Sequence, residues 1–152
     1  MKNGRPKSRR SKIESADAES TRAMINAVIR LEKKVWKAAQ KREADIFKEL
    51  VPSDAVMIFQ SGIIPQPEYL ATMRERTISR YELRNFHGFM PNPKTVILYY
   101  EALRLGDEAG KLFPQGIVIE ATTWIKRGHR WVAVLNQETP LAAREARAKS
   151  QA

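Results

Sequence analysis

The chain has 152 residues, of which 43% are hydrophobic, and it carries a formal net charge of +10 and no cysteine. This length suits one domain with a real core, and the lack of cysteine excludes disulfides, thiolate metal sites and cysteine nucleophiles. No unbroken apolar run exceeds five residues, whereas a membrane helix needs about 20, so we expect no membrane association. No apolar segment follows the basic start as in a signal peptide, and we expect a cytoplasmic location.

The positive charge is concentrated at the two ends of the chain. Residues 1–12 contain six lysines and arginines and no acid, and the last residues add a further net two charges. The part between them is therefore nearly neutral. We predict a disordered basic tail at 1–15, a folded domain at 16–141 and a short polar tail at 142–152. The basic tail is interpreted as solubilising, and the alternative is contact with nucleic acid or another anionic partner through counterion release.

The first half of the sequence predicts helices. Apolar residues recur at spacings of three and four between Met24 and Gln40, with neither Gly nor Pro, which is typical of an amphipathic helix. Residues 43–50 predict a second, short helix that the following proline ends. Residues 55–62 are interpreted as a strand that runs into a Gly turn, and 65–76 as a third helix, which tolerates proline at its start.

The second half of the sequence predicts strands near 81–90, 95–105, 115–126 and 130–138, with a basic turn that joins the last two into a hairpin. Helices followed by an antiparallel meander indicate an α+β fold. The strands are apolar on both faces, whereas a sheet with one solvated face would alternate. We therefore expect the sheet to be covered twice, by its own helices and by a second subunit.

Three segments in this order resemble the nuclear transport factor two-like superfamily, in its SnoaL-like branch. The first segment, "LEKKVWKAAQKREADIFKELVPSDAVMIF", matches the branch's first two helices with their glutamate and tryptophan. The second, "QSG", matches its first turn, and the third, "IEATTWIKRGHRWVAVLNQETP", matches its final hairpin. The resemblance implies a cone-like roll in which three N-terminal helices pack on a curved, mainly antiparallel sheet. It also implies a homodimer with a pocket inside each cone. Members of the family include isomerases, dehydratases, polyketide cyclases and binding or scaffold domains.

The family's ketosteroid isomerases provide a test of mechanism. Their reaction needs an Asp base and an oxyanion pair of one Tyr and one protonated Asp. In an ungapped comparison these three positions fall on Phe59, Val35 and Ala121. None of the three side chains can move a proton or donate to an oxyanion. We therefore expect the isomerase mechanism to be absent.

The same comparison predicts which side of the sheet faces the cavity, because Ala121 would face inward. The cavity residues predicted in this way are Val35, Phe59, Leu98, Tyr100, Ile119, Ala121, Thr123, Val134, Asn136 and Glu138. The opposite face would carry Trp124, Trp131 and Leu135, and it is predicted to form the homodimer interface, since interfaces are enriched in Trp.

Within this cavity, Glu138 and Tyr100 are the candidate acid–base groups, with His87 as a further candidate, since a carboxylate in an apolar cavity can serve as a base. Neither a metal site nor a cofactor motif is expected. The predicted function is binding of a small, mostly apolar ligand in the cone. The alternatives are a lyase or isomerase that uses Glu138 and Tyr100, and a dimeric interaction module whose basic tail contacts an anionic partner.

Overall fold

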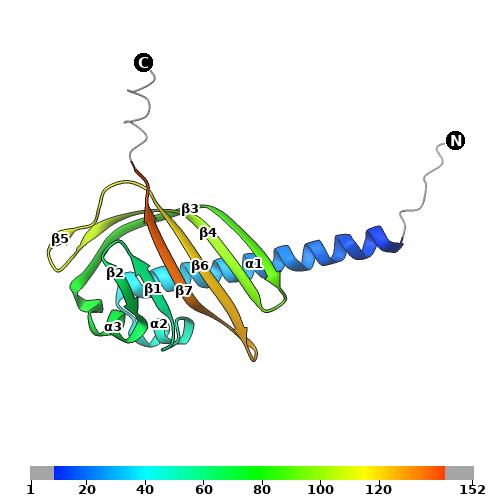
Figure 1. Cartoon of the computed structure of the whole chain (residues 1–152), viewed down its shortest axis with the longest axis horizontal. Coiled ribbons are helices and arrows are strands. Elements are labelled where there is room, and N and C mark those ends of the chain that lie inside the picture. The colour runs from blue at the N-terminus through cyan, green and yellow to red at the C-terminus, as the bar shows by residue number, and fades with distance from the viewer. Residues whose placement is uncertain (1–8, 143–152) are drawn as a thin grey trace, which may run out of the picture.

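The computed structural model describes residues 9–142, so parts of both predicted tails lie outside the described residues. As predicted, two helices, a short strand segment and a third helix come first, and the remaining strands follow (Figure 1). The helices are α1 (Arg9–Lys41), α2 (Ala44–Leu50), α3 (Gln66–Ala71) and the 3₁₀ helix η1 (Met73–Glu75). The strands are β1 (Val56–Phe59), β2 (Gly62–Pro65), β3 (Arg76–Asn92), β4 (Thr95–Glu108), β5 (Lys111–Leu112), β6 (Val118–Arg127) and β7 (Arg130–Pro140).

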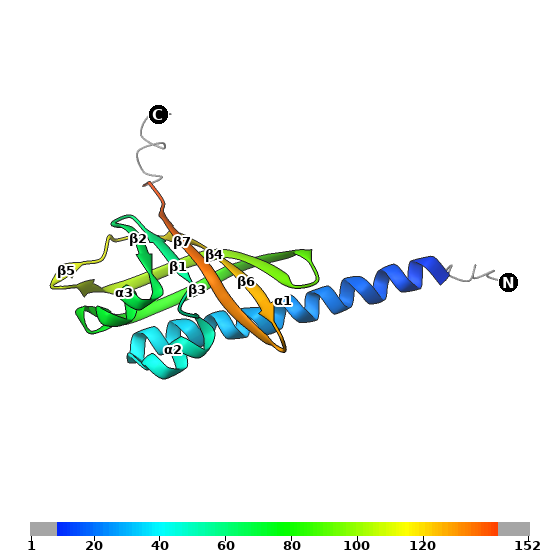
Figure 2. The same ribbon diagram turned by 60° about the horizontal axis from the view of Figure 1, so that its bottom comes forward.

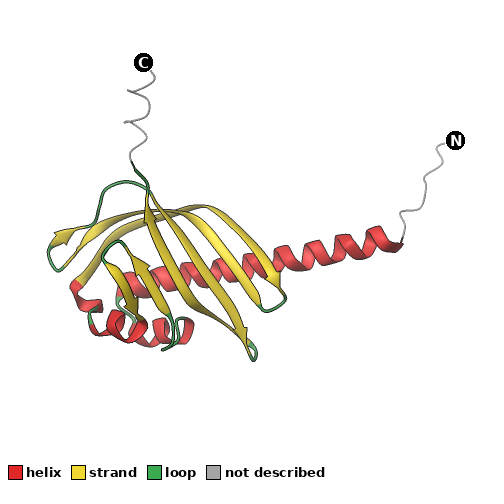
Figure 3. Cartoon of the chain, in the orientation of Figure 1, coloured by secondary structure: helices red, strands yellow, loops and turns green. Residues whose placement is uncertain are grey.

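The strands form one sheet in the order β2-β1-β7-β6-β4-β3, and β5 pairs with the end of β4. All pairs are antiparallel except β1 with β7. The sheet curls over the helices (Figure 3), which confirms the predicted α+β roll with its curved, mainly antiparallel sheet. Register shifts within the β3–β4 pair, one of them beside Asn85 with its positive φ of 57°, bend the long strands.

The predicted strand at 55–62 is a hairpin of two strands. Its turn ends at Gly62, which has a φ of +139° that favours glycine. The following segment "GIIP" returns along β1 as β2, and the prediction missed it because the segment is short and ends at Pro65, directly before α3.

Helix α1 begins at Arg9, inside the segment that we predicted as a disordered tail. The stretch from Arg9 contains neither Gly nor Pro, and an i,i+4 ion pair joins Arg10 to Glu14 at 3.3 Å. Residues 9–23 are all exposed, and this part of α1 projects beyond the sheet (Figure 2). Within residues 9–142, no helix combines the length and hydropathy that crossing a bilayer requires.

The core lies between α1 and the concave face of the sheet. Val28 of α1 and Val96, Leu98 and Trp124 of the sheet are fully buried there. The helix approaches β3 closely at Gly88, where a Cβ would lie 2.9 Å from a methyl carbon of Ile25. The alternate residues of β4 that include Val96 and Leu98 therefore face the helices.

The predicted inward face of β6 is wrong. Val118, Glu120, Thr122 and Trp124 are buried and alternate with partly exposed residues that include Ala121. The register of β6 and β7 shifts near the hairpin, because Thr123 pairs with Leu135 and Trp124 pairs with Ala133. Val134 is the extra residue of this β-bulge, so one alternation cannot hold across the whole hairpin.

This reversal changes the predicted dimer surface. Trp124 is 0% exposed inside the cone, and Trp131 packs against the core cluster. Of the three residues proposed for the interface, Leu135 alone has an exposed side chain, at 38%. The outer face of the sheet instead presents apolar side chains of β4 and β6, among them Tyr99 and Ile119.

Candidate functional site

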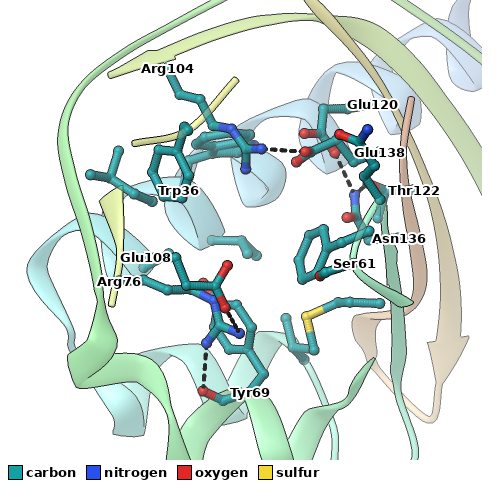
Figure 4. Close-up of a pocket in the computed structure, with 18 of the residues that line it drawn as sticks. Trp36, Ser61, Tyr69, Arg76, Arg104, Glu108, Glu120, Thr122, Asn136 and Glu138 are labelled. Atoms are coloured by element: carbon teal, nitrogen blue, oxygen red, sulfur yellow. Dashed lines mark hydrogen bonds and ion pairs between the residues drawn. The ribbon is translucent and has the colours of Figure 1, made fainter. Parts of the chain in front are cut away.

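A cavity of about 800 Å³ opens between the helices and the concave face of the sheet. Most of its wall is apolar. The apolar lining comes from all three helices, from β1 and from the segment after β5, and it includes Val35, Ala39, Phe47, Met57, Phe59, Tyr69 and Phe113. The polar lining comes mainly from the long strands and includes Glu32, Arg76, Arg104, Glu108, Glu120, Thr122, Asn136 and Glu138 (Figure 4).

The residues that sequence analysis assigned to the cavity are divided between three places. Val35, Phe59, Asn136 and Glu138 line the cavity. Leu98 and Tyr100 are buried on the same side of the sheet, in the packing between the sheet and α1. The remaining residues lie on the outer side of the sheet or at the bulge, and they are Ile119, Ala121, Thr123 and Val134.

His87 lies away from the cavity as well. It is exposed on β3, and its ring stacks on Tyr99 at a centroid distance of 5.2 Å. Both residues belong to the outer face of the sheet, where their strands pair directly. The candidate role of His87 in the cavity is therefore incompatible with its position.

Two glutamates face each other across β6 and β7. Glu120 pairs with Glu138 in the strand register, and the residues are 2% and 6% exposed. Asn136 Nδ2 donates to Glu120 Oε2 at 3.0 Å, and Arg104 of β4 forms an ion pair with Glu138. The Arg104 guanidinium in turn lies over the Phe113 ring, 4.4 Å from its centroid. Arg104 therefore pairs with Glu138, and the neighbouring carboxyl of Glu120 has no ion-pair partner among the described residues.

This arrangement changes the acidity of the pair. Burial raises the pKa of Glu120 well above its usual range, and the charge of Glu138 raises it further, against the hydrogen bond from Asn136 that lowers it. Two close carboxylates of which one has a raised pKa share a proton. Such a pair can donate a hydrogen bond, accept one, or transfer a proton to a bound molecule.

A third buried carboxyl, that of Glu32, organises the space behind this pair. Glu32 lies on α1 and accepts hydrogen bonds from Tyr100 Oη at 2.6 Å, Thr122 Oγ1 at 2.8 Å and Trp124 Nε1 at 2.6 Å. Burial raises its pKa, and the three hydrogen bonds oppose this shift. Trp36 Nε1 also donates to the Tyr100 oxygen at 2.6 Å. The Tyr100 hydroxyl is thus engaged on both sides and does not serve the cavity.

Another ion pair lies on the other side of the cavity from Glu138 (Figure 4). Arg76 Nη2 approaches Glu108 to 3.1 Å, and Arg76 Nη1 donates to Thr72 Oγ1 at 2.8 Å. Its guanidinium lies 4.6 Å from the centroid of the Tyr69 ring, which stacks on Phe47. Burial raises the pKa of Tyr69, whereas the charges of Arg76 and Arg104 lower it.

The sequence analysis missed Glu32, Arg104 and Glu120, which carry most of the charge at the polar end of the cavity. A signal was present for two of them. Arg104 lies between Leu103 and Leu105, and Glu120 lies between Ile119 and Ala121, and charges that are buried among apolar residues are paired or functional. The wrong alternation on β6 placed Glu120 on the outside and Ala121 in its place.

No protein-family model matches the chain, and no curated protein matches it. Solved structures do. An NTF2-like protein from Cytophaga hutchinsonii has a TM-score of 0.71 at 14% identity, over 76% of this chain and 97% of that one. The association domain of C. elegans CaMKII has a TM-score of 0.67 at 15% identity, over 80% of this chain and 99% of that one.

A proposed dehydratase of the NTF2-like family from Streptomyces avermitilis is similar to the same extent, with a TM-score of 0.67 at 14% identity over 80% of this chain and 98% of that one. Structural matches at identities this low establish the fold alone, and any chemistry has to be argued from the residues of the site. The curled sheet, the three helices and these matches together show that the chain has the nuclear transport factor two-like (NTF2-like) fold.

Proposed function

We propose that the chain binds a small, mostly apolar molecule in the cone, with the polar part of that molecule held at the Glu120–Glu138 end. The observation that carries this proposal is a cavity of about 800 Å³ whose wall is apolar and whose polar groups converge at a few points. Small-molecule sites usually have this form and this size. Phe47, Met57 and Phe59 provide the apolar contact area.

A second candidate function is an acid–base lyase or isomerase. The observation that favours it is the pair of Glu120 and Glu138, buried in register at one end of an apolar cavity, since burial raises the pKa of Glu120 well above its usual range and such a carboxyl is a candidate acid or base. Dehydration, the reaction proposed for the Streptomyces avermitilis protein, belongs to this class. Glu120 would take the role first assigned to Tyr100, because the Tyr100 hydroxyl is held by Glu32 and Trp36.

Filling the cavity tests the binding proposal. We expect a hydrophobic fluorescent dye to bind the unmodified chain and Val35→Trp to weaken that binding about tenfold or more, because the indole would occupy the space between α1 and β1. Fluorescence titration measures both affinities. Ala23→Trp is the matched control, because Ala23 is exposed on the projecting part of α1. Equal dye affinity in Val35→Trp and in the unmodified chain would show that the dye binds elsewhere.

We also propose that the chain forms a homodimer through the outer face of the sheet. Tyr99 and Leu105 are 44% and 55% exposed there, and Ile97, Leu103 and Ile119 extend the apolar surface. Apolar surface of this kind marks association sites. The similarity to the association domain of CaMKII supports assembly as well.

Charge on the proposed dimer surface should prevent assembly. We expect Tyr99→Asp to give a monomer at micromolar concentration, because the carboxylate would be buried without a partner in the interface. Light scattering on the unmodified chain and the variant measures this change. Lys37→Glu, on the exposed side of α1, should leave the mass of the dimer unchanged. A monomeric unmodified chain at the same concentration would contradict the proposal.

A further inference from the structure

The inner end of the cavity contains an excess of buried acid. Glu32, Glu120 and Glu138 are 3%, 2% and 6% exposed, and all three line the cavity. Arg104 is the cation that pairs with this group, and it pairs with Glu138. The other arginine of the lining, Arg76, is paired with Glu108. Two carboxyls of the three therefore have no cationic partner among the described residues.

Hydrogen bonds connect the three carboxyls of this acidic group to their neighbours and join two of the carboxyls to each other. Both oxygens of Glu32 are occupied by protein donors. Glu120 accepts from Asn136 at Oε2, and Glu138 accepts from Arg104 at Oε1. Within residues 9–142, the one fully buried side-chain polar atom without a partner is Arg104 Nε. Glu120 and Glu138, on neighbouring strands and in register, also form a side-chain hydrogen bond with each other, which requires a proton between the two carboxyls.

We propose that this end of the cavity recognises an organic cation, namely a small apolar molecule with one protonated amine. The ammonium group would take the place of the proton between Glu120 and Glu138 and donate hydrogen bonds to both carboxylates, while the apolar body lies against Phe59 and Phe47. This inference rests on the proposed binding function and specifies the class of ligand.

Charge complementarity favours a cation over a neutral or anionic ligand. A buried carboxylate without a cation is unstable and takes up a proton instead. An ammonium replaces that proton and adds charge-assisted hydrogen bonds, which are stronger than neutral ones. An anion at this end would face the carboxyls of Glu120 and Glu138, and the unpartnered Nε of Arg104 is fully buried.

Proton release should accompany binding of an amine. The groups that act on Glu120 are Glu138, Asn136 and Glu32, and Arg104 of β4 is paired with Glu138; the charge of Glu120 in turn raises the pKa of the buried phenols of Tyr69 and Tyr100. Burial and Glu138 keep Glu120 protonated in the empty cavity, and the ammonium displaces this proton. Affinity for an amine therefore rises with pH until Glu120 is ionised without the ligand, and it falls at higher pH, where the amine itself deprotonates.

Three probes of one shape test the inference: naphthylmethylamine, naphthylmethanol and naphthoate, which are a cation, a neutral molecule and an anion at pH 7. We expect the amine to bind about tenfold or more tightly than the alcohol, as one charge-assisted hydrogen bond allows, and naphthoate to bind most weakly. Titration calorimetry in buffers of different ionisation enthalpy should detect proton release with the amine and none with the alcohol.

Two variants connect the preference to the carboxyl pair. Glu120→Gln should reduce the ratio of amine to alcohol affinity about tenfold, because the amide cannot take a negative charge. Glu82→Gln, at an exposed position of β3, should leave the ratio unchanged. Equal affinities for amine and alcohol, or tighter binding of naphthoate, would overturn the cation inference and leave the binding function standing. Failure of all three probes to bind would overturn both.

Discussion

Replacing Glu32 with alanine is expected to lower the free energy of unfolding by about 3–5 kcal/mol, the range of the largest single-residue effects. The carboxyl accepts hydrogen bonds from Tyr100, Thr122 and Trp124, and it is 3% exposed. Alanine would leave three donors in an apolar interior, each of which costs about 1–3 kcal/mol when it is unpaired. It would also open a cavity beside Trp124, which is fully buried.

Urea unfolding, followed by tryptophan fluorescence, measures this loss. Glu32→Gln is expected to lose less, because its amide oxygen still accepts hydrogen bonds in the same place. Glu19→Ala is the matched control on the same helix, where the side chain is exposed, and it should change the free energy of unfolding by less than about 0.5 kcal/mol. A loss of under about 1 kcal/mol in Glu32→Ala would show that the three donors find other partners, and it would remove the structural role assigned to this residue.

The order of helices and strands could be predicted from the sequence because each element carries a local signal. The apolar spacing between Met24 and Gln40 and the basic turn before Arg130 depend on neighbouring residues alone. The start of α1 at Arg9 was missed for a related reason. The charged segment that begins at Arg9 has no apolar periodicity, so its composition is typical of a disordered tail. It contains neither Gly nor Pro, however, so the helix can extend through it.

The residues of the site were harder to predict because their positions depend on which face of a strand is buried. A shift of one residue moves a whole strand's side chains to the other face. The bulge at Val134 produces such a shift, so Asn136 and Glu138 were placed inside while Trp124 was placed outside. Glu120 was also misplaced because an acidic residue in a strand is usually expected to face water. This expectation fails where polar groups line a cavity.

The free energy of unfolding should fall as the pH rises from about 5 to 8, and Glu120→Gln should reduce this fall. Burial and Glu138 raise the pKa of Glu120 in the folded chain, while its value in the unfolded chain stays near the usual 4.3 or so. The unfolded chain therefore loses this proton at lower pH than the folded chain. The stability that the neutral carboxyl provides is complete below the unfolded pKa and is lost as the pH rises towards the folded pKa.

Glutamine stays neutral at every pH and keeps the shape of the side chain, so the variant should lose less stability than the unmodified chain as the pH rises. Urea unfolding at a series of pH values compares the two slopes. Some slope should remain in the variant, because burial raises the pKa of Glu32 in the same direction. Glu82→Gln should keep the slope of the unmodified chain. An equal slope in Glu120→Gln would show that Glu120 is ionised in the folded chain, and that the carboxyl pair holds no proton for a ligand to displace.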